Sequence, residues 1–162
     1  MENKRKIILI SSVAISLVLI LTIALCLVFL LPTKVHIESD KSVYIHRIST
    51  ENDFYNPNIT TDGVKIGKEG INDLNELLSS YNLYNPPLVN NVVEDISEDI
   101  FIRVYDSRGA LVLTYHFCSN GKASITKYDK KVSTTKEYNV NHNKEASKQL
   151  INDIISKYFN EQ

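Results

Sequence analysis

The stretch IFIRVYDSRGALVLTYHFCSNGKASITKY, residues 100–128, decides the fold of this chain. It contains three apolar runs and two turn sequences, namely Ile100–Tyr105, Asp106–Gly109, Ala110–Cys118, Asn120-Gly121 and Ala123–Tyr128. Asn-Gly between apolar runs is a strong signal for a β-hairpin, because both central residues of a type I′ turn need a positive φ. The stretch therefore predicts an antiparallel meander, and Thr135–Val140 extends it as a fourth strand.

A two-residue loop at Asn120-Gly121 pairs Cys118 with Ala123, Phe117 with Ser124 and His116 with Ile125, whereas an extra residue in the turn changes this match. Alternate residues of a strand share a face. One face of the second strand therefore carries four large apolar side chains: Leu111, Leu113, Tyr115 and Phe117. The pattern does not say which face is the core side. If helices leave this face open, the four residues are the predicted partner-binding patch.

The flanking sequence predicts further strands and two helices. Short strands are expected at 35–37, 43–48 and 64–66, a loop at 49–63, and an acidic connector at 85–99. Ile71 to Tyr81 has apolar residues three and four apart, and so does Ala146 to Phe159, where Asn141 or Asn143 can cap the helix. The predicted class is α+β, with a transmembrane helix followed by a small antiparallel sheet packed with two helices, the second C-terminal.

The uncharged run Ile7 to Leu31 predicts the membrane segment. As a helix it is about 37 Å long at ~1.5 Å per residue, which exceeds a hydrocarbon layer of roughly 30 Å. Its serine and threonine hydroxyls can bond to carbonyls one turn back, so they are compatible with insertion. The expected organisation is a basic leader at 1–6, a transmembrane helix at 7–32 and one extracytoplasmic domain at 33–162.

Two alternatives to an uncleaved anchor are a cleaved signal peptide and a lipoprotein leader. The run is longer than a signal-peptide core and lacks a small-x-small site after it. Cys26 loosely resembles a lipobox cysteine, but Leu25 stands where a small residue is needed. Lys4, Arg5 and Lys6 favour a cytoplasmic amino terminus.

Charge and cysteine content narrow the function classes. The residues after the apolar run carry 15 basic and 18 acidic side chains, a net charge of −3, which disfavours nucleic acid as a partner. Cys118 is the only cysteine after the apolar run, so no disulfide can form within the domain.

Few residues are candidates for chemistry. His116 and Cys118 share a strand face, where a thiol or metal role competes with two side chains that merely line a half-buried sheet. Ser-x-x-Lys begins at Ser119, Ser124 and Ser133, but on strands or turns rather than at a helix start. The carboxylates at 94, 95, 98 and 99 lack the pattern of a calcium loop. We therefore predict no catalytic residue, no metal site and no cofactor.

The layout resembles a group of small membrane-anchored extracytoplasmic domains of unknown function in low-GC Gram-positive bacteria. The likeness is carried by Leu31-Pro32, Ile71 to Tyr81, the strand Ile100 to Tyr105 and Asn120-Gly121-Lys122. Such domains stand alone or are appended to membrane sensor peptidases, but this chain has no H-E-x-x-H motif. The resemblance implies a bacterial α+β module without an established activity.

The sequence thus predicts a single-pass membrane protein that is not an enzyme. Its extracytoplasmic domain would be a binding or accessory module for a protein or cell-envelope ligand. The alternative is a scaffold or regulatory subunit of a membrane complex that assembles through the transmembrane helix, where Ser11, Ser12 and Ser16 could pack against a partner.

Overall fold

The computed structural model describes residues 2–48, 63–85, 98–130 and 132–159, without the side chains of 2–11 and 28–29. The chain divides into two compact units, Met1–Leu31 and Pro32–Gln162. Each unit is described by itself below.

The first unit is the helix α1, Glu2–Leu30. Within it, the Ser16 hydroxyl donates to the Ser12 carbonyl at 2.9 Å and the Thr22 hydroxyl donates to the Val18 carbonyl at 2.8 Å. The expectation that hydroxyls bond one turn back is confirmed for these two residues. Over the described residues, no helix combines the length and apolarity needed to cross a membrane.

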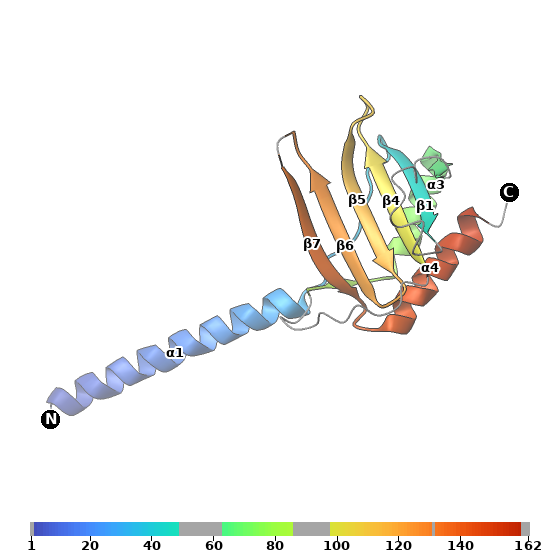
Figure 1. Ribbon diagram of the computed structural model, residues 1–162. Helices are drawn as coiled ribbons and strands as arrows, with labels where there is room; N and C mark the ends of the chain where they lie inside the picture. The colour runs from blue at the N-terminus through green and yellow to red at the C-terminus, as the bar shows by residue number, and fades with distance from the viewer. Residues whose placement is uncertain (1, 49–62, 86–97, 131, 160–162) are drawn as a thin grey trace. The chain divides into compact units, whose positions relative to one another are not determined.

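The second unit is built on an antiparallel sheet in which most neighbouring strands also follow each other in the sequence (Figure 1). Its strands are β1 (Ser42–Ile48), β2 (Val64–Ile66), β3 (Leu83–Tyr84), β4 (Asp99–Tyr105), β5 (Leu111–Cys118), β6 (Lys122–Tyr128) and β7 (Ser133–Val140). Over the described residues their order is β2-β1-β4-β5-β6-β7-β3, and every neighbouring pair is antiparallel. The predicted α+β class and meander are confirmed.

Two short elements differ from the prediction. Val35 and Ile37 are buried but belong to no strand, because the Ile37 backbone bonds to the Asn75 side chain instead of to a sheet neighbour. The strand β3 lies where the sequence suggests only the end of a helix, and it pairs with the end of β7.

The loop between β5 and β6 has three residues, so of the two alternatives the one with an extra residue in the turn holds and the two-residue register does not. Phe117 pairs with Ala123 and His116 with Ser124. Gly121 has a positive φ of +95°, whereas Asn120 does not have a positive φ. The Gly121 backbone N–H donates to the Cys118 carbonyl at 3.1 Å. This is the pattern of a tight turn followed by a left-handed glycine, which adds one residue to the loop.

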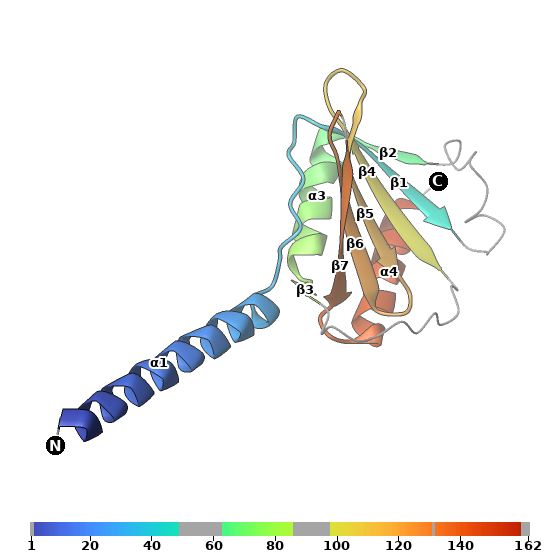
Figure 2. The ribbon, with the colours of Figure 1, turned by 60° about the vertical axis from the view of Figure 1, so that its left-hand side comes forward.

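Two helices cover one face of the sheet (Figure 2). They are α3 (Lys68–Ser79) and α4 (Lys144–Tyr158), and the Asn143 side chain caps α4 by accepting from the Glu145 backbone, as one of the two predicted caps. The helices contact each other, since the Tyr158 hydroxyl donates to the Gly70 carbonyl at 3.2 Å. Their apolar stripes and one sheet face form a single core, which includes Ile45, Leu74, Ile102, Phe117, Leu150 and Ile154.

Because strands alternate, the opposite sheet face carries a different set of side chains. We call it the polar face: it presents Tyr44, His46, Asp99, Phe101, Arg103, Tyr105, Thr114, His116 and Cys118. The core therefore fixes the strands from one side, and the other side of the sheet carries mainly polar and aromatic groups, with the buried Ile48 opposite Asp99.

Candidate functional site

Three residues of the predicted partner-binding patch, Leu113, Tyr115 and Phe117, lie on the core side of the sheet. Tyr115 is 5% exposed and Phe117 is 1% exposed, and both belong to the core under the helices. Leu111 and Leu113 are half-buried, and Leu113 packs against the same core. The condition attached to the patch, an apolar face left open by the helices, is therefore not met for Tyr115 and Phe117.

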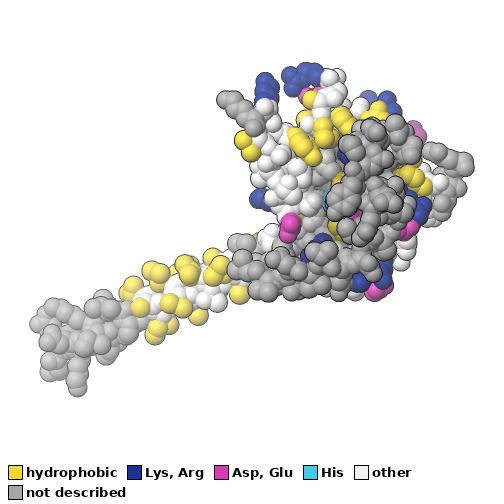
Figure 3. Space-filling model, viewed as in Figure 1, with side chains coloured by type: hydrophobic (Ala, Val, Ile, Leu, Met, Phe, Trp, Pro, Cys, Tyr) yellow, Lys and Arg dark blue, Asp and Glu magenta, His cyan; other side chains and the backbone are white. Residues whose placement is uncertain are grey.

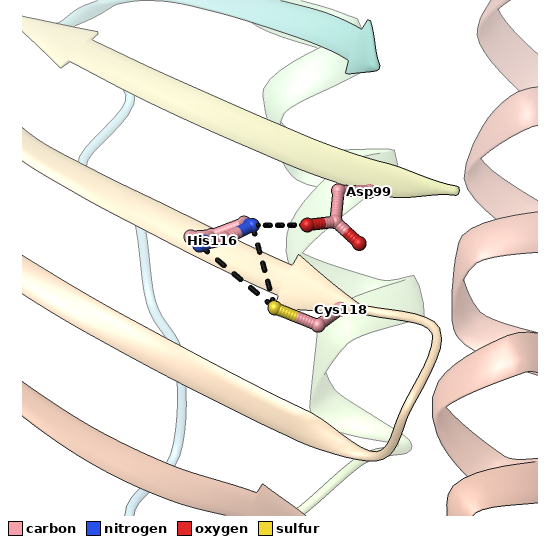
Figure 4. Close-up of side chains that lie close together, drawn as sticks. All are labelled: Asp99, His116 and Cys118. Atoms are coloured by element: carbon pink, nitrogen blue, oxygen red, sulfur yellow. Dashed lines mark hydrogen bonds and ion pairs between the residues drawn. The ribbon is translucent and has the colours of Figure 1, made fainter. Parts of the chain in front are cut away.

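The polar face instead brings three side chains together at one end of the meander. Asp99 at the start of β4 and His116 and Cys118 near the end of β5 converge, as Figure 4 shows. The Nε2 atom of His116 lies 2.7 Å from Oδ2 of Asp99 and 3.4 Å from Sγ of Cys118. One ligand-type atom from each of the three residues lies within 4.8 Å of the others.

Local backbone geometry explains this convergence. His116 and Cys118 are two residues apart on one strand, so their side chains share a face. Asp99 is the register partner of Cys118 across the β4–β5 hairpin. An irregularity between Val104 and Tyr105 shifts the hairpin register by one residue and places Asp99 opposite Cys118. The site therefore depends on that bulge as much as on the residues themselves.

The surroundings of the three residues are tightly constrained. Asp99 is 1% exposed, and its Oδ1 atom has no hydrogen-bond partner within the described part of the chain. The Phe101 ring stacks on the His116 imidazole, with centroids 3.9 Å apart and planes 13° apart. Burial, and then the negative charge of Asp99, raise the pKa of the Cys118 thiol well above its usual range.

This geometry does not match a cysteine nucleophile activated by histidine. Such a site uses one imidazole nitrogen for the acid and the other for the thiol. Here Nε2 is the nitrogen nearest to both Asp99 and Cys118, while Nδ1 lies 3.9 Å from the sulfur. The raised pKa of Cys118 also keeps the thiol protonated at neutral pH.

The other three histidines of the chain do not belong to this cluster. His36 is exposed, His46 is buried on the polar face beside β4, and His142 stacks on Tyr84 with centroids 3.9 Å apart. No metal-ligand cluster other than Asp99, His116 and Cys118 is found among the described residues.

The remaining sequence motifs have ordinary structural roles or lie outside the described residues. The three Ser-x-x-Lys serines lie outside helix starts, as predicted: Ser124 and Ser133 are on strands and Ser119 is in a turn. Glu98 forms an ion pair with Arg47, whereas the carboxylates at 94 and 95 are outside the described residues. Asp99 belongs to a strand rather than to the predicted connector, and sequence reasoning missed it as a site residue.

A hollow of about 400 Å³ lies at the other end of the polar face. It is lined by Ser42, Tyr44, His46, Arg103, Tyr105 and Gly109. The Tyr44 and Tyr105 rings meet edge to face, with centroids 5.5 Å apart. Within the part of the chain that the structure describes, the Arg103 guanidinium forms no ion pair. The hollow thus combines aromatic walls with an arginine that has no ion pair among the described residues.

No protein-family model matches the chain, and neither a curated protein nor a solved structure shows significant similarity to it.

Proposed function

We propose that this chain is a single-pass membrane protein that displays its α+β domain outside the cytoplasm as a binding or accessory module. In this proposal residues 7–32 are the span and the basic leader at 1–6 stays in the cytoplasm. The domain recognises a protein or cell-envelope ligand and performs no covalent chemistry.

One observation carries the proposal, namely the large apolar side chains that α1 presents without burying them. The described ones between Val13 and Leu31 are 49–67% exposed, and Figure 3 shows them along the helix. The helix α1 ends at Leu30 and so contains nearly all of the uncharged apolar run from Ile7 to Leu31. Apolar surface of this extent is unfavourable in water and is satisfied by lipid.

The geometry of the polar face supports binding rather than catalysis. The Cys118 thiol has a raised pKa and shares one imidazole nitrogen with Asp99, so it lacks the features of an activated nucleophile. The hollow is lined by the Arg103 side chain together with two tyrosine rings, Tyr44 and Tyr105. Such a site suits an anionic group, for example a carboxylate of a protein or envelope ligand, which arginine can hold with two hydrogen bonds.

Membrane fractionation of the full chain tests the anchor. We expect the protein to resist extraction by alkaline carbonate and to dissolve only with detergent. A doubly charged variant, Leu17→Lys with Leu21→Lys, should move to the soluble fraction, because a lysine at the centre of a span costs about 2.5–3.5 kcal/mol. Val132→Lys is the matched control, since Val132 is 67% exposed in the domain and outside the proposed span.

Recovery of the unaltered chain in the soluble fraction without detergent would overturn the anchor. Protease added to intact cells tests the orientation, and we expect it to digest the domain. Replacing residues 1–33 with an unrelated anchor separates the binding domain from the alternative of a scaffold assembled through its helix. If the chimera still binds its ligand or partner, the result supports recognition by the domain. If binding is lost, the result supports assembly through the transmembrane helix.

A further inference from the structure

We propose that Asp99, His116 and Cys118 form a binding site for a divalent cation of the zinc class, with one coordination position left for an external ligand. The site lies on the polar face at the opposite end from the hollow around Arg103. It goes beyond the proposed function and does not depend on membrane anchoring.

The three donor types fit zinc, which accepts thiolate sulfur, imidazole nitrogen and carboxylate oxygen. With bonds of about 2.3 Å to sulfur and 2.0–2.1 Å to nitrogen, tetrahedral ligands stand about 3.6 Å apart for sulfur and nitrogen. The distance from Nε2 of His116 to Sγ of Cys118 is 3.4 Å. The oxygen–nitrogen separation is 2.7 Å and must open to about 3.3 Å on the same bond lengths. The imidazole and the carboxylate therefore have to move apart by about 0.6 Å to admit the cation.

A second observation points to a ligand at this place. A carboxylate that is 1% exposed normally has partners for both oxygens, yet Oδ1 of Asp99 has none within the described residues. Leaving such an acceptor unsatisfied costs about 1–3 kcal/mol, and more for a charged group. A cation bound by both oxygens of this carboxylate supplies the missing partner of Oδ1.

The charges also balance in the loaded site. Asp99 contributes one negative charge, and cation binding replaces the Cys118 thiol proton to contribute a second. A neutral His116 completes the set, so a divalent cation gives a centre with no net charge in a buried place. One proton leaves the thiol for solvent, and His116 carries its ring proton on Nδ1 so that Nε2 can bind. Lys122 and Glu137 are further charged groups that act on Cys118 from β6 and β7.

The fixed ring of His116 favours binding over a chance contact. Phe101 stacks on the imidazole and orients it before a cation arrives. The His116 side chain is 17% exposed, so the place is accessible from one side while Asp99 lies beneath it.

Cobalt and zinc titrations of the reduced full chain in detergent micelles test the proposal. We expect Co²⁺ to bind with one equivalent and to give a sulfur-to-cobalt charge-transfer band, which only a coordinated thiolate produces. Binding of either cation to the empty site should release about one proton from the thiol, and Zn²⁺ should then displace Co²⁺ without releasing a further proton. Cys118→Ser should abolish the band, whereas the matched variant Cys26→Ser, which alters the other cysteine, should retain it.

Asp99→Asn and His36→Ala complete the design. Asp99→Asn keeps the shape of the side chain and should weaken zinc binding at least about tenfold, the scale of losing a group that tunes a metal site. His36→Ala removes an exposed histidine away from the cluster and should leave affinity unchanged. Far-ultraviolet circular dichroism identifies any variant that fails to fold. If Cys118→Ser fails to fold, the charge-transfer band of the Cys26→Ser variant decides whether Cys118 binds the cation, because Cys118 is then the only thiol in the chain. Absence of that band, or zinc affinity equal in Cys118→Ser and the unaltered chain, would overturn the site.

Discussion

Truncating Phe117 to alanine is expected to destabilise the domain much more than truncating Phe101, although the two phenylalanines lie on neighbouring strands. The Phe117 side chain is 1% exposed and belongs to the core under α3 and α4. The Phe101 side chain is half-buried on the polar face and stacks on His116. The comparison therefore tests which face of the sheet is the core.

The magnitudes are well separated. Removing a fully buried phenylalanine costs about 3–5 kcal/mol, from lost burial and the cavity left behind. Removing Phe101 forfeits an aromatic stack worth about 0.5–1.5 kcal/mol and part of a burial term. Since a domain of this kind has a total stability of about 5–15 kcal/mol, Phe117→Ala should remove about a fifth of it or more.

Urea unfolding of the full chain in detergent, followed by circular dichroism of the sheet, measures both variants against the unaltered protein. Equal slopes of the transitions show that the free energies are comparable. A loss for Phe101→Ala as large as for Phe117→Ala would refute the assignment of the two faces, and with it the position of the Asp99, His116 and Cys118 cluster.

Three further predictions concern turns, caps and pH. Gly121→Ala should cost more than about 1 kcal/mol in thermal or urea unfolding, because φ is +95° and an added Cβ comes within 3.1 Å of a backbone atom. Gly67→Ala meets nothing within 4 Å and should cost less, through the weaker N-cap of α3 alone. Asn143→Ala should cost about 0.5–2 kcal/mol through the lost helix cap, with exposed Asn152→Ala in the same helix as control. Burial, and then a hydrogen bond to a carboxylate, raise the pKa of Tyr81 from 10.0 to about 12. The unfolded chain therefore releases this proton first, the free energy of unfolding should fall as pH rises from 10 to 12, and an equal slope in Tyr81→Phe would contradict this.

The elements with a strong period could be predicted from sequence, and their limits could not. The meander and both helices follow from runs of apolar residues at spacings of two or of three and four. The hairpin after Cys118 differs because Asn120-Gly121 is compatible with a two-residue or a three-residue loop. In the structure Gly121 lies against the Lys144 backbone and accepts a hydrogen bond from the Val140 backbone N–H, and the sequence of the hairpin alone does not contain these contacts.

The sequence pattern of the hairpin also does not show which face of the sheet is the core. In the two-residue register the apolar face of β5 lies opposite Ser124 and Thr126, so both faces of the predicted hairpin are mixed and give no preference. The neighbours of β5 decide the matter: Ile45 and Ile102 are register partners, both fully buried, and Tyr115 pairs with Ile102. The core side of a mixed strand is thus set by pairing, which a single strand does not encode.

The candidate site shows the same limit at the level of chemistry. Strand periodicity is sufficient to place His116 and Cys118 on one face. Asp99 is separated from Cys118 by a hairpin in which Tyr105 pairs with Leu111 but Val104 pairs with Leu113. Without that bulge the register would set Asp99 opposite Phe117, with the core residues. The extra residue thus turns an acid at the end of a connector into the third member of a buried cluster, and it re-aims a side chain in the way that bulges do beside functional sites.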